Sequence, residues 1–180
     1  MKKMLRNLGA VVALSLAACG DPGGGNGDGN TVCTGTYSGA VTGRVRFCSL
    51  EATRQSSGQL QYSLLIEPEQ GSGTVESSDT LLITLTGEPK TGTLTGSAIT
   101  QALGAVYSTN DRQYSLQQGL GGESLGSVSL TIESVPTAQN AGNGNTLYQW
   151  FGGKAQIRYA AAAGAGYTGT VDLTLDFEPQ

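Results

Sequence analysis

The sequence contains no histidine among its 180 residues, and it has only one tryptophan, two methionines and three cysteines. Without histidine, no Ser-His-Asp or Cys-His arrangement can form, and a serine hydroxyl is a poor nucleophile without an activating base. The usual histidine and cysteine shell of zinc is also excluded. We therefore expect a protein that is not an enzyme, with no catalytic residues, no bound metal and no cofactor.

The sequence also lacks helical periodicity. From Cys33 onward, no segment repeats its apolar residues every 3.6 positions, as an amphipathic helix does. The period is two instead, which is typical of strands with one buried face. Alternating apolar residues occur in 60–66, 81–85, 128–132, 155–159 and 171–177.

Glycine-rich and asparagine-rich segments separate these alternating runs. Examples are 87–90, 119–122 and 140–145, which contain residue types that favour turns. Such spacing predicts an all-β domain of about eight to ten short antiparallel strands. We expect a β-sandwich or a jelly-roll-like arrangement, and the pattern leaves a barrel open as an alternative.

Two glycine motifs match catalytic or cofactor patterns by their letters alone. Residues 122–126 read GESLG, the G-x-S-x-G of hydrolase elbows, but the chain has no histidine to activate Ser124. Residues 164–169 read GAGYTG, but only eleven residues follow, too few for the helix and acidic residue of a dinucleotide site. We interpret the second motif as a hairpin loop before the last strand.

Paired carboxylates, which glycosidases need, occur at Asp172 and Asp176 on the polar side of one expected strand. Four residues along a strand span ~13 Å, which is wider than either glycosidase geometry. A solvated face explains this pair better. Carboxylates from different strands could still converge in the fold.

The first eighteen residues have the architecture of an export signal. Lys2, Lys3 and Arg6 form a basic start, and residues 8–16 form an apolar run. This run is too short for a membrane-spanning helix, which needs roughly 20 apolar residues. We assign residues 1–18 to a signal peptide.

The last residues of this leader, Leu16-Ala17-Ala18-Cys19, resemble the lipobox of bacterial lipoproteins. The resemblance implies that Cys19 carries a diacylglycerol, that the leader is cut before it, and that the protein is held in a membrane of the bacterial cell envelope. Gly20 rather than aspartate follows the cysteine, which by the sorting rules of that family favours the outer membrane. An ordinary secretory signal with Ala-x-Ala cleavage is the alternative.

Residues 19–31 contain little that can be buried and are rich in Gly, Asn and Asp. We expect them to form a flexible tether behind the lipid, and a single β-rich domain over 32–180. The alternating acids and amides of the tether resemble a calcium loop only in composition, because the spacing fits no EF-hand.

Lipidation of Cys19 leaves two cysteines, Cys33 and Cys48. Export to an oxidising compartment favours a disulfide between them. Binding of a metal by these two thiols is the weaker alternative, since no histidine is present to complete a site.

Loss of the three basic leader residues would leave seven basic and fourteen acidic side chains, a formal charge of −7. The remaining basic residues form no cluster, so nucleic acid is not an expected partner.

Trp150, with Tyr148 and Phe151 beside it, is the only candidate for a ligand-binding platform, because aromatic rings near a loop can stack on sugars. Trp150 and Phe151 point to opposite faces of a strand, so we expect at least one of them in the core. Our first hypothesis is a lipid-anchored envelope protein with a structural or binding role, whose partner is an envelope protein or a glycan. A carbohydrate-binding module and an enzyme-inhibitor lipoprotein are the alternatives.

Overall fold

The computed structural model describes residues 33–120 and 124–178, which form thirteen strands and one 3-10 turn. The strands are β1 (Cys33–Gly39), β2 (Gly43–Arg54), β3 (Gln59–Pro68), β4 (Val75–Ser78), β5 (Leu81–Thr86), β6 (Gly92–Thr95), β7 (Gln101–Ser108), β8 (Gln113–Gln118), β9 (Ser127–Ser134), β10 (Gln139–Gly142), β11 (Asn145–Gln149), β12 (Gly152–Ala160) and β13 (Thr170–Phe177). The 3-10 turn, η1, covers Gly96–Ala98.

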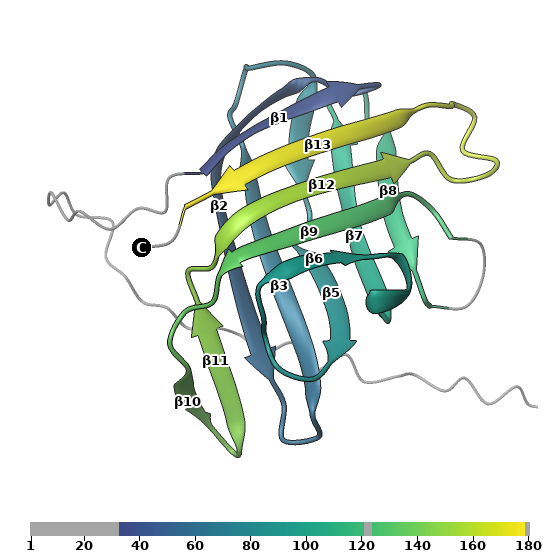
Figure 1. Ribbon diagram of the computed structural model, residues 1–180. Coiled ribbons are helices and arrows are strands. Elements are labelled where there is room, and N and C mark those ends of the chain that lie inside the picture. The colour runs from purple at the N-terminus through teal and green to yellow at the C-terminus, as the bar shows by residue number, and fades with distance from the viewer. Residues whose placement is uncertain (1–32, 121–123, 179–180) are drawn as a thin grey trace, which may run out of the picture.

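Eight of these strands close into an antiparallel barrel. Their order is β1-β13-β12-β8-β7-β5-β3-β2, and β2 pairs again with β1 to complete the circle. The link between β8 and β12 is a single pair, Ala160 with Ser115. Most of β12 pairs instead with β9, so β9 and β6 extend the front sheet of the barrel downward (Figure 1).

The other extra strands lie along the barrel edges. β5 pairs with the first residues of β7, and β4 pairs with its last residues. β11 pairs with the last residues of β2. β10 pairs with β11 and forms the outermost strand of the hairpin at the lower left of Figure 1. The prediction of an all-β antiparallel domain is confirmed, and the pairing closes it as a barrel, the alternative to the expected sandwich or jelly roll.

Inward-facing side chains fill the barrel. On β13, Val171, Leu173, Leu175 and Phe177 are at most 1% exposed, while the residues between them face outward. An eight-stranded barrel has an interior just wide enough to be filled in this way. Ligand contacts are therefore expected at the barrel ends or on its outer surface. The largest fully buried side chains are Tyr62, Tyr114, Tyr159, Phe151 and Phe177.

A disulfide joins β1 to β2, and it is the predicted pair, Cys33 with Cys48. Backbone pairing between these two strands covers only Thr36 with Arg44 and Tyr37 with Gly43. The disulfide, with a Cα–Cα distance of 5.6 Å, therefore holds β1 and β2 together beyond the point where their ladder stops. Cys19 lies outside the described residues, as do the signal peptide and the tether assigned to 1–31.

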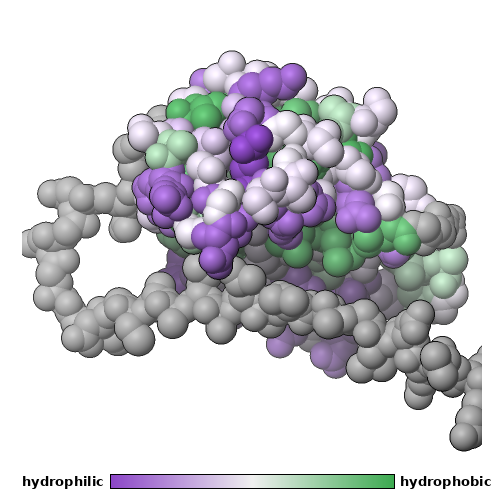
Figure 2. Space-filling view, turned by 90° about the horizontal axis from the view of Figure 1, so that it is seen from below, coloured by the Kyte–Doolittle hydropathy of each residue, from purple (hydrophilic) through white to green (hydrophobic). Residues whose placement is uncertain are grey.

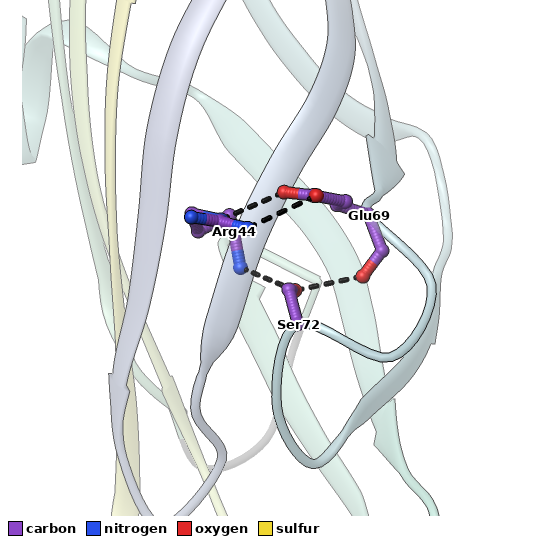
Figure 3. Close-up of polar contacts among 3 residues, drawn as sticks. All are labelled: Arg44, Glu69 and Ser72. Carbon is purple, nitrogen blue, oxygen red and sulfur yellow. Dashed lines mark hydrogen bonds and ion pairs between the residues drawn. The ribbon is translucent and has the colours of Figure 1, made fainter.

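One end of the barrel, where β2 begins and β3 ends, is covered by the loop between β3 and β4, and we call it the closed end. Arg44 donates from Nε and Nη2 to the carboxylate of Glu69 at 2.7 and 3.1 Å (Figure 3). The amide of Arg44 donates to Ser72 Oγ at 2.8 Å, and that hydroxyl donates to the Glu69 carbonyl at 2.7 Å. Thr42 and Thr74 exchange two further bonds beside them. The loop is thus fixed to the start of β2 by backbone groups of Thr42 and Arg44 as well as by the side-chain pair of Arg44 and Glu69.

Within residues 33–120 and 124–178, no helix has the length and apolar character needed to cross a membrane.

Candidate functional site at the other end of the barrel

A small pocket lies at the opposite end of the barrel, where β2 ends and β3 begins, and we call this the pocket end. The pocket has a volume of about 220 Å³ and is built by β3, β5, β6 and the loop between β5 and β6. This loop runs along the lower end of the barrel in Figure 1, and Figure 2, viewed from below, shows hydrophobic surface set among hydrophilic residues. Barrel mouths are frequent sites of ligand binding. The pocket is lined by Tyr62, Leu85, Thr86, Glu88, Lys90 and Leu94, with Gly87 between them.

Three aromatic rings form the floor beneath this end. Phe151 is fully buried and packs edge-on against Tyr62, with ring centroids 5.4 Å apart. Tyr148 also lies near Phe151, with a centroid distance of 6.4 Å. Strand alternation explains the cluster, because Tyr62 on β3 and Tyr148 on β11 both face inward and both strands pair with β2.

Glu88 is held at the pocket rim by two partners. Tyr148 donates its hydroxyl to Glu88 Oε2 at 3.2 Å. Arg54 Nε lies 2.9 Å from Glu88 Oε1, an ion pair whose angle falls outside hydrogen-bond geometry. The Glu88 side chain remains 59% exposed. Its carboxylate is therefore fixed in position while still able to accept hydrogen bonds from a ligand.

The two tyrosine hydroxyls at this end stay protonated at neutral pH. Burial raises the pKa of Tyr62 to about 12, and the nearby Tyr148 adds to the rise. Burial and the hydrogen bond to Glu88 raise the pKa of Tyr148, against which the positive charge of Arg54 acts. Tyr148 is consequently a stable donor to Glu88.

Trp150, the predicted platform residue, is half-buried and has a φ of 68°. This left-handed conformation is strained for a bulky side chain, and such strain is concentrated at functional and turning points of proteins. Phe151 is in the core, as expected for one of the two neighbours. Tyr148 is only 9% exposed, so the structure does not bring Tyr148 and Trp150 together as two exposed rings.

The carboxylates of Asp172 and Asp176 point outward from β13 and meet cations. Arg158 Nε donates to Asp172 at 2.6 Å, and Lys154 Nζ lies 3.9 Å from Asp176. Lys154 is also 3.5 Å from Glu133 on β9. These contacts agree with the interpretation of a solvated face, and they show that its carboxylates form ion pairs.

The described residues of the two glycine motifs lie between strands. Ser124 is exposed, and its hydroxyl donates to the carbonyl of Gln117 at 3.3 Å. Residues 164–169 belong to the loop between β12 and β13, as expected. In this loop the hydroxyl of Tyr167 donates to the Gln113 carbonyl at 2.7 Å, which fixes the loop to β8.

Sequence reasoning did not identify Arg54, Glu88 and Lys90. Arg54 precedes Glu88 by 34 positions in the sequence, and none of the three residues belongs to a recognisable motif. The one indication of this site in the sequence is the predicted turn Gly87-Glu88-Pro89-Lys90. Charged residues in a turn at a barrel end can face a ligand.

A comparison of this chain with protein-family models, with curated proteins and with solved structures finds no match in any of the three.

Proposed function

We propose that this chain is a lipid-anchored, non-enzymatic binding protein of the bacterial cell envelope, held at the outer membrane through Cys19. The disulfide between Cys33 and Cys48 is the observation that carries the anchor. It accounts for two of the three cysteines of the sequence, and the third stands at the end of the LAAC segment. Oxidising export conditions and lipidation therefore explain all three cysteines together.

The binding role is supported by the pocket beside Tyr62, which lies at one end of a filled barrel. Larger hollows lie on the outer surface, one on β2 to β4 and one on β9, β12 and β13. Apolar side chains occupy the barrel lumen, whereas Glu88 and Lys90 project at the pocket rim. A site with apolar walls and a few fixed polar groups is the usual form of a small-molecule site. Among the alternatives considered from the sequence, this favours sugar binding over enzyme inhibition.

Metabolic labelling of the full chain with radioactive palmitate, followed by detergent phase separation, tests the anchor. The wild type is expected to take up label and enter the detergent phase, and Cys19→Ala is expected to do neither. The double variant Cys33→Ser/Cys48→Ser is the matched control and should keep its label. Detergent partitioning of Cys19→Ala would show that the proposal is wrong, and density-gradient separation of membranes checks the outer-membrane assignment.

A further inference from the structure

We propose that the pocket formed by Tyr62, Leu85, Glu88, Lys90 and Leu94 binds one neutral sugar residue, an inference that rests on the binding role proposed above. The site is distinct from the Trp150 platform expected from the sequence. It combines an apolar wall with both signs of charge at its rim.

The pocket has an apolar wall of limited area, which can contact part of the C–H face of a pyranose ring. Leu85 and Leu94 are 8% and 7% exposed, and Tyr62, at 1%, presents only a small part of its surface. The rim supplies the complementary polar groups, because Glu88 accepts hydrogen bonds while Lys90 and Thr86 donate them. A sugar offers both donors and acceptors around an apolar ring face.

Charge at the rim argues against the other ligand classes. An anion would approach the Glu88 carboxylate, and the sequence as a whole carries a net charge of −4. A cation would meet Lys90 and the guanidinium of Arg54, which lies 2.9 Å from Glu88. A purely apolar ligand would take these groups from water without replacing their hydrogen bonds, which is unfavourable. A neutral molecule rich in hydroxyls satisfies them all.

The size of the pocket limits the ligand to one ring. Its volume of about 220 Å³ is below the ~300–1,000 Å³ of pockets that enclose drug-sized molecules. A terminal residue of an envelope glycan therefore fits better than one in the middle of a chain.

Tyr148 acts here as a positioning residue. It does not line the pocket, but its hydroxyl holds Glu88 Oε2 at 3.2 Å. Packing against Phe151 fixes the tyrosine ring in turn. The Glu88 carboxylate is therefore oriented before the ligand arrives, which limits the entropy lost on binding.

Saturation-transfer NMR of the full lipidated chain in detergent micelles tests the ligand class. The probes are glucose, galactose and N-acetylglucosamine as neutral sugars, with glucuronate and glucosamine as charged counterparts. We expect transfer to at least one neutral sugar and none to the charged ones. Absence of transfer to every neutral sugar, or equal transfer to a charged one, overturns the proposal.

Three variants tie binding to this pocket. Leu94→Trp fills the pocket and is expected to abolish binding, and Glu88→Gln is expected to weaken it about tenfold through loss of charged hydrogen bonds. Glu69→Gln is the matched control, because Glu69 forms the equivalent arginine pair at the closed end. Wild-type affinity in a folded Glu88→Gln protein places any binding elsewhere and overturns the site, even if Leu94→Trp fails to fold.

Positioning by Tyr148 has its own test. Tyr148→Phe should weaken binding severalfold in the wild type and have no further effect in the Glu88→Ala background, which lacks the acceptor of the tyrosine hydroxyl. Equal effects in both backgrounds mean that Tyr148 does not act through Glu88. Mass spectrometry of the same preparations shows whether the chain carries the lipid. A lipidated chain that does not bind sugar refutes the pocket alone. A chain without lipid refutes the anchor alone.

Discussion

Each end of the barrel carries an arginine from β2 paired with a glutamate that follows another strand, Arg44 with Glu69 after β3 and Arg54 with Glu88 after β5. At the closed end, the loop also bonds to β2 through Ser72 and backbone groups, so its polar atoms are used within the protein. At the pocket end, the second partner of the glutamate is a tyrosine side chain, and apolar rings lie beneath it.

This difference shows that an ion pair takes its role from its surroundings. The Arg44 side chain is 66% exposed, and exposed pairs contribute at most about 1 kcal/mol. The Arg54 side chain is 36% exposed, and Glu88 is also fixed by Tyr148. The first pair fastens a loop, whereas the second presents a carboxylate beside a pocket.

The largest effect is expected from Phe151→Ala at the pocket end. Phe151 is fully buried and packs near both Tyr62 and Tyr148, and truncation of a buried phenylalanine lowers the free energy of unfolding by about 3–5 kcal/mol. Chemical denaturation measures the change. Val41→Ala, also fully buried but at the closed end, is the control and should lose roughly 2 kcal/mol. Equal losses would mean that the aromatic cluster is not the main support of the pocket end.

Removal of the disulfide should have the next largest effect. Cys33→Ser/Cys48→Ser opens a loop of 15 residues and is expected to lower the free energy of unfolding by about 3 kcal/mol. Because β1 pairs with β2 only near Gly43, amide exchange should rise more at Thr34 than at Tyr37. Uniform exchange along β1 would show that its pairing with β13, which runs from Cys33 to Gly39, holds the strand without the disulfide.

The sequence predicted the strands better than their closure. The alternating runs 60–66, 81–85, 128–132, 155–159 and 171–177 all lie within strands, because burial of one face imposes a period of two locally. Barrel closure instead depends on contacts between distant residues, such as Ala160 with Ser115 and Thr36 with Arg44. No local pattern encodes which strands meet.

The candidate site was harder to predict for the same reason. Glu88 becomes a site residue only because β2 brings Arg54, and β11 brings Tyr148, to the same end of the barrel. The aromatic content near Trp150 was visible in the sequence, but the direction of each ring depends on strand pairing. The cysteine pair was predictable, since only two cysteines remained after lipidation was assigned.

Alkaline pH should test the interior near the closed end. Burial raises the pKa of Tyr37 to about 12, offset in part by the Ser78 hydroxyl, which does not reach hydrogen-bond geometry. In the unfolded chain the tyrosine ionises near pH 10, so the unfolded state binds fewer protons and stability falls from pH 10 to 12. Tyr37→Phe should remove a share of that fall on the order of 2 kcal/mol, measured by denaturation across this range. An unchanged pH dependence contradicts the assignment.

A smaller effect is expected from Ser72→Ala at the closed end. The hydroxyl accepts from the Arg44 amide at 2.8 Å and donates to the Glu69 carbonyl at 2.7 Å. Their loss should lower the free energy of unfolding by about 1 kcal/mol. Sugar binding at the pocket end should not change, and a parallel loss of binding would show that the two ends are coupled.

The smallest effect is expected from Tyr159→Phe, and it separates two kinds of tyrosine hydroxyl. Within the described part of the chain, the buried hydroxyl of Tyr159 has no hydrogen-bond partner, whereas that of Tyr148 donates to Glu88. Removing an unpartnered buried hydroxyl should leave the free energy of unfolding unchanged within about 0.5 kcal/mol or raise it, while Tyr148→Phe should lower it by about 1 kcal/mol. Denaturation of both variants measures this difference. A loss of 1 kcal/mol or more in Tyr159→Phe would mean that an internal water bonds this hydroxyl, so that the interior near the closed end is polar and hydrated rather than dry.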